Sequence, residues 1–341
     1  MMRNIAFWIL LFLIPTIKSQ ESASPSLRVM WYNVENFFDC QDDTLTNDNE
    51  FLPSGRKGWT YPKFIEKSNH IAKVITAIGE WNNPALVGLC EVENNKCLDH
   101  LTKFSPLKQL KYKFIHHESP DPRGIDVALL YDPLQFKPLK EHAIKVKLPS
   151  GHLTRDVLYV KGIAAGKDTL HVFVCHFPSR LGGELASEHK RICVASLIKT
   201  KIDSIFVKNK SANVMVMGDF NDYPTNKSLN EALAALPIGK SVNNTQLYNL
   251  MYPMHLNEKG TNKYKGEWGM LDQIIVSGSL LVPSSKITVR NSEAHVFDAD
   301  FLLEDDVKYL GKQPCRTYVG FKYHGGYSDH LPVYVDLKIN K

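Results

Sequence analysis

Short apolar runs in this sequence end repeatedly in side chains that can bind a metal ion or move a proton. Five such endings occur, and they carry Asn33, Glu91, His176, Asp219 with Asn221, and Asp329 with His330. Open α/β sheets place their ligand sites at the carboxyl ends of strands. Five polar endings of this kind therefore predict one shared site.

Two of these endings suit a divalent cation and a water molecule. Glu91 follows the apolar run 86–90, so its carboxylate needs either solvent or a cation, and a hard oxygen-binding ion such as Mg²⁺ is a suitable partner. Asp219 and Asn221 are two residues apart, which in an extended chain puts both side chains on one face. Together they could hold one water molecule or one phosphate oxygen.

Histidines and a further carboxylate could supply proton transfer. Asp329 and His330 place a carboxylate beside an imidazole at the entrance to a strand, which suits metal binding and protonation of a phosphate. Asp272 could orient and charge a histidine, or it could cap a turn. His176 and Asn33 also have structural interpretations, as a buried core histidine and as a residue that ends a strand.

Two arginines in glycine-containing loops could bind phosphate. Arg180 lies in segment 178–184, directly after His176, and Arg123 lies in segment 123–126, ahead of another strand. A guanidinium group can bind phosphate with two hydrogen bonds, and glycine lets the backbone approach a ligand closely. Asp126 could orient one of these groups. A surface arginine in a flexible turn is the structural alternative for both positions.

These residues must be positioned by strands and helices, and the apolar pattern predicts both. Near-continuous apolar runs suit strands that are buried on both faces. The expected strands are Leu27–Asn33, Leu86–Val92, Val127–Tyr131, Leu170–Phe177, Val214–Phe220, Gln273–Val276 and Leu331–Leu337. Apolar residues fall on one helical face in Phe64–Ile78 and in Ala195–Ile205. The pattern is that of an α/β or α+β fold.

The first nineteen residues have the layout of a signal peptide. Arg3 precedes the apolar run Ile5–Ile14, and Pro15 and Ser19 follow it. The run is shorter than the roughly 20 residues that span a bilayer, although an uncleaved anchor is an alternative. We therefore expect residues 1–19 to be removed, the protein to be secreted or periplasmic, and no integral membrane association to remain. Residues 27–341 contain no linker-like tract or repeat, which favours a single domain.

Charge and cysteine content narrow the partners only slightly. The formal net charge is +5, and removal of residues 1–19 takes away two positive charges and leaves +3, so nucleic acid is neither supported nor excluded. The six cysteines are irregularly spaced and form no C-x-x-C pair, which argues against a zinc site built on thiolates. Cys90 and Cys175 lie in apolar runs and are expected to be buried rather than disulfide-bonded.

Taken together and in this order, these strings resemble the endonuclease/exonuclease/phosphatase superfamily, which includes the deoxyribonuclease-I-like enzymes. The resemblance extends from Asn33 to His330. Its most specific parts are the strings at 218–221 and 328–333, with support from 271–274. Members of this superfamily have a four-layer α/β sandwich, in which two packed sheets lie between outer helices. The resemblance implies the same fold here.

The resemblance also implies a role for each polar ending. Asn33, Glu91 and Asp329 match residues that contact the divalent metal. Asp219 and Asn221 match residues that position and activate the attacking water. The implied cofactor is Mg²⁺ or Mn²⁺, with Ca²⁺ as an alternative.

The remaining matches concern the phosphate and the leaving group. His330 matches a phosphate-binding catalytic histidine, Asp272 matches the carboxylate that pairs with it, and His176 matches a histidine that assists at the leaving group or the phosphate. A phosphate ester repels hydroxide, so its displacement needs positive charge near the phosphate oxygens and a carboxylate that directs the water. The sequence therefore predicts a metal-dependent hydrolase of phosphate esters.

The substrate remains open within this chemistry, because a fold does not determine its function. A phosphodiesterase or nuclease is our expectation. A phosphomonoesterase acting on sugar, inositol or lipid phosphates and an inactive ligand-binding relative are the alternatives. Lys263, Lys265 and Trp268 interleave basic and aromatic residues, as in surfaces that stack nucleic-acid bases, although ordinary surface loops do so too. We expect the protein to be a monomer.

Overall fold

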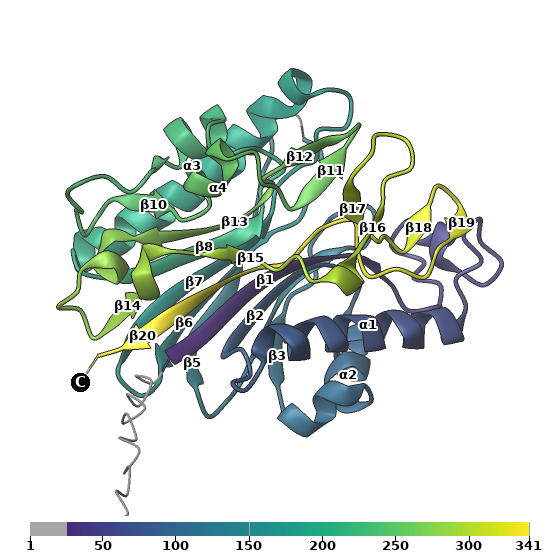
Figure 1. Ribbon diagram of the computed structural model, residues 1–341, viewed down its shortest axis with the longest axis horizontal. Helices are drawn as coiled ribbons and strands as arrows, with labels where there is room; N and C mark the ends of the chain where they lie inside the picture. The colour runs from purple at the N-terminus through teal and green to yellow at the C-terminus, as the bar shows by residue number, and fades with distance from the viewer. Residues whose placement is uncertain (1–25, 150, 341) are drawn as a thin grey trace, which may run out of the picture.

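The computed structural model describes residues 26–149 and 151–340, so the predicted signal peptide at residues 1–19 lies outside the described residues. Two seven-stranded sheets form the centre of the molecule. Figure 1 shows them packed together, with α1 and α2 on one outer side and α3 on the other. This arrangement is the predicted four-layer α/β sandwich.

The first sheet is built around the N-terminal strand. This strand pairs in parallel with β2 and antiparallel with the C-terminal strand β20, so both ends of the described chain lie in one sheet. In spatial order its strands are β14 (Ile287–Val289), β20 (Val333–Ile339), β1 (Ser26–Phe37), β2 (Leu86–Val92), β4 (Asp126–Tyr131) and β3 (Lys113–His116), with β15 (His295–Val296) also paired to β20.

The second sheet places β8 at its centre, where β8 pairs in parallel with β7 and antiparallel with β13. In spatial order its strands are β5 (Phe136–Ile144), β6 (Val157–Ala164), β7 (Asp168–His176), β8 (Asn213–Asp219), β13 (Asp272–Ser277), β10 (Leu247–Asn249) and β9 (Ala235–Leu236). The ladder registers place both His176 and Asp272 opposite Asp219. Pairing alone therefore brings three predicted site residues together.

Helices cover the outer faces, and small hairpins extend beyond the sheets. The helices are α1 (Tyr61–Gly79), α2 (Asn95–Lys103), α3 (Glu184–Lys208) and the short α4 (Tyr252–Leu256). The hairpins are β11 (Asn262–Tyr264) with β12 (Glu267–Gly269), β16 (Leu303–Asp305) with β17 (Lys312–Pro314), and β18 (Tyr318–Val319) with β19 (Lys322–Tyr323). Single 3₁₀ turns occupy Asn49–Phe51, Pro106–Leu110, Gly278–Leu281, Arg290–Ser292 and Asp300–Leu302, and a π turn occupies Ser228–Ala232.

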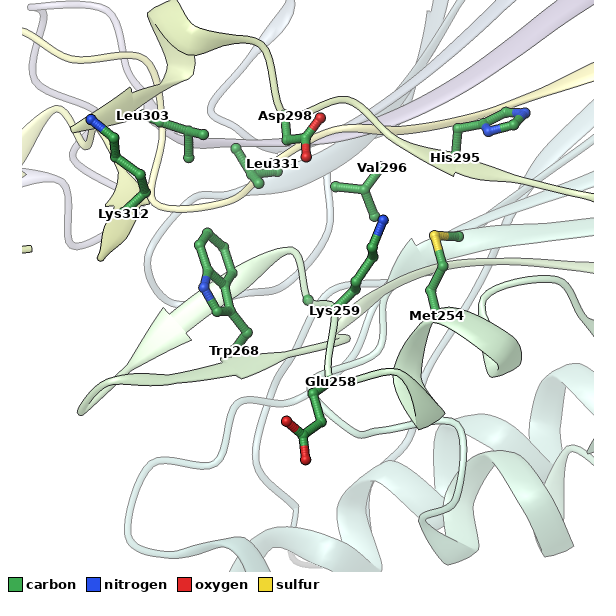
Figure 2. Close-up of a pocket in the computed structure, with 11 residues that line it drawn as sticks. Met254, Glu258, Lys259, Trp268, His295, Val296, Asp298, Leu303, Lys312 and Leu331 are labelled. Atoms are coloured by element: carbon green, nitrogen blue, oxygen red, sulfur yellow. The ribbon is translucent and has the colours of Figure 1, made fainter. Parts of the chain in front are cut away.

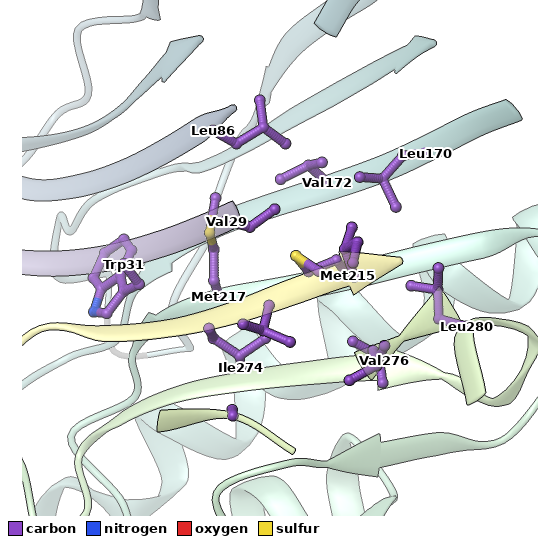
Figure 3. Close-up of a cluster of buried hydrophobic side chains, with 14 of the residues drawn as sticks. Val29, Trp31, Leu86, Leu170, Val172, Met215, Met217, Ile274, Val276 and Leu280 are labelled. Carbon is purple, nitrogen blue, oxygen red and sulfur yellow. The ribbon is translucent and has the colours of Figure 1, made fainter. Parts of the chain in front are cut away.

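The apolar core lies in three layers that match this architecture. Val29, Trp31, Met215 and Ile274 belong to the cluster between the two sheets, and Figure 3 shows side chains from both sheets meeting there. Two further clusters fill the spaces under α1 and α2 and under α3. Burial on both faces explains why the central strands are apolar almost without interruption. Within residues 26–149 and 151–340, no helix is long and apolar enough to cross a membrane.

The predicted strands and both predicted helices are present; the strand Leu86–Val92 is matched at both ends by β2, and the other elements differ at one or both ends. The largest extension is at the second helix, which begins at Glu184 and ends at Lys208. Cys90 and Cys175 are buried and unpaired, as predicted. Strands β3, β5 and β6, together with all the strands of two or three residues, were not predicted from the sequence.

Candidate active site

Predicted site residues from both sheets meet at one end of the sandwich. Asn33 comes from β1 in the first sheet, and Asp219 ends β8 in the second. The Asn33 amide donates a hydrogen bond from Nδ2 to Asp219 Oδ2 at 3.1 Å. The same Asn33 side chain accepts the Glu35 backbone N–H at its Oδ1 atom, at 3.0 Å. Asn33 therefore connects the two sheets across the site.

Asp219 is the buried centre of this arrangement. Its Oδ1 atom accepts the backbone N–H of Asn221 at 2.9 Å. Its Oδ2 atom lies 3.6 Å from His176 Nε2 and 3.9 Å from His330 Nε2. Burial raises the pKa of Asp219 to about 7; His330 limits this increase and Asp272 adds to it. A carboxylate with such a pKa is suited to accept a proton near neutral pH.

His330 forms a tight pair with Asp272. The Nδ1 atom of His330 lies 2.6 Å from Asp272 Oδ2, and the other oxygen of Asp272 accepts the indole N–H of Trp31 at 2.8 Å. Burial opposes the charged imidazole, but attraction by Asp272 and Asp219 outweighs burial and raises the pKa of His330 well above its usual value. These two carboxylates favour the imidazolium form of His330, whose Nε2 atom faces Asp219.

The pKa of His176 shifts in the opposite direction. Its pKa falls well below the usual value because of burial first, and then because of the positive charges of Arg155, Arg123 and His330. The buried Nδ1 atom of His176 has no hydrogen-bond partner among the described residues. The surroundings thus favour the charged form of His330 and the neutral form of His176 beside the same carboxylate, which suits the two to different tasks in proton transfer.

Asn221 differs from the geometry expected from its spacing. We predicted that Asp219 and Asn221 would share one face of an extended chain, but β8 ends at Asp219 and Asn221 has a φ of 50°. The left-handed backbone turns the Asn221 amide toward Phe177, whose carbonyl accepts its Nδ2–H at 3.1 Å. Asn221 holds Asp219 through its backbone N–H instead of lying beside it on a strand.

Carboxylates and arginines form the other side of the site. Glu91, with a φ of 60°, accepts the backbone N–H of Asn36 at 3.0 Å and lies 3.8 Å from Arg123 Nη2. Asp329 accepts a hydrogen bond from Arg316 Nη2 at 2.7 Å. The two arginine side chains are 48% and 44% exposed, so they balance these carboxylates from the solvent side.

The donor set on this side fits a hard divalent cation. Asn33, Glu91 and Asp329 supply amide and carboxylate oxygens, which Mg²⁺, Mn²⁺ and Ca²⁺ prefer. Glu91 and Asp329 attract arginines, which indicates that both carboxylates need a compensating positive charge. Asp219, Asp272 and His330 also have potential ligand atoms within 4.8 Å of one another.

That second group is better explained as an acid–base arrangement. Both oxygens of Asp272 already have close partners in Trp31 and His330. The positive charge favoured on His330 also offsets one of the two carboxylate charges. The assignment of the metal ligands to Asn33, Glu91 and Asp329 stays the prediction made from the sequence.

Four charged residues near the site were missed from the sequence. Arg316 and Glu35 lie 3.5 Å apart, measured between Nε and Oε1. Arg155 donates to the Phe177 carbonyl at 2.6 Å. Lys67 is fully buried and donates to Thr317 Oγ1 and to the Tyr327 carbonyl, each at 2.6 Å. Of these four residues, only Lys67 could have been recognised from the sequence, because it lies between Phe64 and Ile71 on the apolar face of the predicted helix.

Two predicted substrate contacts are corrected by the structure. Arg180 donates from Nε to the Asn221 carbonyl at 2.7 Å and from its other nitrogens to Glu184, Asp222 and Asn226. It therefore braces the turn after β8 instead of presenting a free guanidinium to substrate. All three guanidinium nitrogens of Arg180 therefore have acceptors, and the sequence motif did not predict these contacts.

Asp126 also has a different environment from the one predicted. It accepts the backbone N–H of Ser119 at 2.9 Å and lies 3.3 Å from His116, so it faces these residues and not either predicted arginine. Arg123 does reach the site, through Asn36 and Glu91. Only one of the three predicted substrate contacts thus lies where a substrate phosphate could meet it.

Two of the basic and aromatic residues of the β11–β12 hairpin, Lys263 and Trp268, have partners within the protein, whereas Tyr264 and Lys265 are exposed. Lys263 is 4% exposed and forms a 2.9 Å ion pair with Asp306. Trp268 packs toward the core and lines a cavity of about 380 Å³ together with Leu331 and Lys259, as Figure 2 shows. None of the eleven predicted site residues lines this cavity.

Comparison with solved structures gives the same fold at low sequence identity. A family protein from Bacteroides thetaiotaomicron has a TM-score of 0.57 at 17% identity, with 93% of this chain and 96% of that chain covered. D. rerio TDP2 complexed with single strand DNA product gives 0.56 at 14%, covering 93% and 99%. The human Nocturnin catalytic domain with bound sulfate anion gives 0.55 at 17%, covering 93% and 96%.

Sequence comparison supplies the family. Curated protein sequences give no match. The model of the Endonuclease/Exonuclease/phosphatase family, whose members generally hydrolyse phosphodiester bonds, matches residues 28–339. This match covers nearly the whole chain and includes both sheets and every predicted site residue. The chain therefore belongs to the endonuclease/exonuclease/phosphatase family.

Proposed function

We propose that this protein is an exported, divalent-metal-dependent phosphodiesterase. The observation that carries the proposal is the placement of Asp219 between Asn33, His176 and His330, with His330 charged by Asp272. An isolated buried carboxylate would be costly, whereas one in contact with a proton-transfer group on each side is arranged for chemistry.

In the proposed reaction, water attacks phosphorus in line with the leaving oxygen. Asp219 accepts the proton of the attacking water, and the Asn221 backbone N–H and the Asn33 amide fix the orientation of its carboxylate. The imidazolium of His330 binds a non-bridging phosphate oxygen and stabilises the charge that develops on it. Asp272 keeps that imidazolium charged and in place.

His176 has a separate task in this scheme. It is neutral and lies at the end of the neighbouring strand, so it can donate a hydrogen bond to the phosphate or the leaving oxygen without repelling the His330 cation. Arg123 can add a hydrogen bond to a phosphate oxygen from the solvent side. A divalent ion bound by Asn33, Glu91 and Asp329 would neutralise phosphate charge and stabilise the leaving oxygen.

Two features support a diester as substrate, and one supports export. The solvent-side arginines 123 and 316 lie beyond the buried acid–base residues and could contact a second part of a chain-like anion. A structural neighbour, D. rerio TDP2, was crystallised with a single-strand DNA product, which keeps nucleic acid among the candidates. The signal-peptide layout of residues 1–19 supports export, and secretion by the source cells would test it.

The test is a substrate panel with and without metal. Bis-p-nitrophenyl phosphate, p-nitrophenyl phosphate, single-stranded and plasmid DNA, RNA, sphingomyelin and inositol phosphates would each be incubated with Mg²⁺, Mn²⁺ or EDTA. We expect metal-dependent cleavage of diesters that EDTA abolishes. Preference for p-nitrophenyl phosphate or inositol phosphates would favour the monoesterase alternative. If none of these substrates is hydrolysed although the folded chain binds Mg²⁺, the inactive ligand-binding relative would be favoured.

A further inference from the structure

A second group of metal-ligand side chains lies on the first sheet, away from the acid–base residues. His116 ends β3, Asp126 begins the neighbouring strand β4, and Glu118 lies in the segment that joins them. One ligand atom from each residue lies within 4.8 Å of the other two. The side chains of His116 and Asp126 are 0% and 2% exposed, whereas Glu118 reaches solvent at 65%.

Two polar atoms in this group lack a hydrogen-bond partner among the described residues. They are the Nε2 atom of His116 and the Oγ atom of Ser119, and both are buried. His116 Nε2 lies 3.3 Å from Asp126 Oδ2 but is not oriented to form a hydrogen bond with it, while Nδ1 of the same ring faces Asn95 Oδ1 at 3.1 Å. A buried imidazole nitrogen without a partner is costly, and it indicates a missing ligand.

The charge balance points to a cation. The carboxylates of Glu118 and Asp126 each place an oxygen within 4.8 Å of the other and of the His116 ring, so two acids meet one imidazole there. A divalent ion would neutralise the two closest carboxylates and supply the partner that His116 Nε2 lacks.

We propose that His116, Glu118 and Asp126 bind a zinc ion, separate from the metal of the active site. One imidazole nitrogen and two carboxylate oxygens form a three-ligand set for Zn²⁺, with a water molecule or Ser119 Oγ in the fourth position. The imidazole distinguishes this set from the all-oxygen donors at Asn33, Glu91 and Asp329, which suit harder ions.

The position of the site gives it a structural consequence. His116 and Asp126 are the two ends of the segment that carries Arg123, and Arg123 contacts Asn36 and approaches Glu91. A bound zinc ion ties these ends together and fixes the base of that loop. Zinc binding itself does not depend on the proposed phosphodiesterase activity.

The experiment is a zinc titration of the full chain after removal of metal with EDTA. Zn²⁺ binding would be measured by calorimetry, and Co²⁺ would report the ligands by visible absorption. We expect one zinc equivalent that His116→Gln and Glu118→Gln each weaken by at least about 10-fold, the scale known for groups that support a metal site. Glu118 is exposed, so its substitution keeps the test valid where His116→Gln disturbs folding.

Three control variants test whether the zinc ion binds at another group of side chains instead. His117→Gln removes the adjacent histidine, which pairs with Glu141, and should leave the zinc equivalent unchanged. Cys315→Ser removes a thiol from a third group, Glu304, Cys315 and His324, and Glu91→Gln removes an active-site carboxylate. Loss of the zinc equivalent in one of these controls, its persistence in both ligand variants, or no zinc binding by the unmodified chain would overturn the proposal. Because bound zinc is measured directly, an inactive enzyme leaves this result intact.

Discussion

The two sides of the candidate active site are built in different ways. The acid–base half consists of His176, Asp219, Asp272 and His330, whose side chains are at most 9% exposed and contact one another. The carboxylate half consists of Glu35, Glu91 and Asp329, whose partners include the exposed arginines 123 and 316.

The difference follows from the backbone that carries each half. His176, Asp219 and Asp272 lie in register on three neighbouring strands, so the sheet itself fixes their separation. Glu35 and Glu91 have φ angles of 51° and 60°, where the strands depart from regular geometry. The acid–base half is therefore set before substrate arrives, whereas the carboxylate half has charges whose solvent-side partners can be exchanged. Chemistry and metal binding should therefore respond to different substitutions.

The largest effect is expected in the acid–base half. Asp219→Ala and His330→Ala should each lower kcat by about 10²–10⁴, because each removes a positioned base or a positive charge at the phosphate. Mg²⁺ affinity, measured by calorimetry, should change little in His330→Ala, and circular dichroism should show an intact fold. Turnover near that of the unmodified enzyme in either variant would refute the assignment.

Substitution in the carboxylate half should act on metal first. Glu91→Gln removes a charged oxygen donor and should weaken Mg²⁺ affinity by about 10–100-fold, with activity partly restored at high Mg²⁺. Glu93→Gln is a matched control, since Glu93 is a nearby carboxylate that accepts the backbone N–H of Asp39 instead of facing the site. If Glu91→Gln leaves Mg²⁺ affinity intact while abolishing turnover, the two halves do not divide the work as proposed.

The sequence predicted the acid–base half better than the carboxylate half for the same structural reason. Strand ends are visible as apolar runs, and parallel pairing of β7 and β8 and antiparallel pairing of β8 and β13 then bring His176, Asp219 and Asp272 together. The resemblance added His330 as the partner of Asp272. The expected face shared by Asp219 and Asn221 was wrong because the strand ends at Asp219.

Partners contributed by irregular segments were not predictable in this way. Arg316 lies in a loop between short hairpins, and its contact with Asp329 depends on how that loop folds. Arg180 was predicted to bind phosphate because the sequence does not show its acceptors, some of which come from the separate turn after β8. Strand β5 was not predicted because it lies at a sheet edge, where buried and exposed residues alternate irregularly and the sequence shows no clear apolar period.

A buried cation behind the carboxylate half offers a test by pH. Burial lowers the pKa of Lys67 from 10.5 to about 8, with Glu35 and Asp329 limiting the decrease. Between these two pKa values the unfolded chain binds a proton that the folded chain lacks, so the free energy of unfolding should rise with pH. The unfolding equilibrium constant should fall by up to about tenfold per pH unit. Urea unfolding of the unmodified chain and of Lys67→Met would be compared from pH 7 to 10. Equal slopes in the two chains would show that Lys67 is not held in this environment.

The smallest effect is expected at the exchangeable arginine of the carboxylate half. Arg316 is 44% exposed and pairs with Asp329, so Arg316→Ala should raise KM by about two- to fivefold, the scale of a partly exposed ionic contact, and leave kcat nearly unchanged. Arg180→Ala is the informative contrast, because Arg180 braces the turn that carries Asn221 and its loss should lower kcat and thermal stability. Steady-state kinetics of both variants decide the matter. A fall in kcat at constant KM for Arg316→Ala would place this arginine with the acid–base half and remove the distinction between the two.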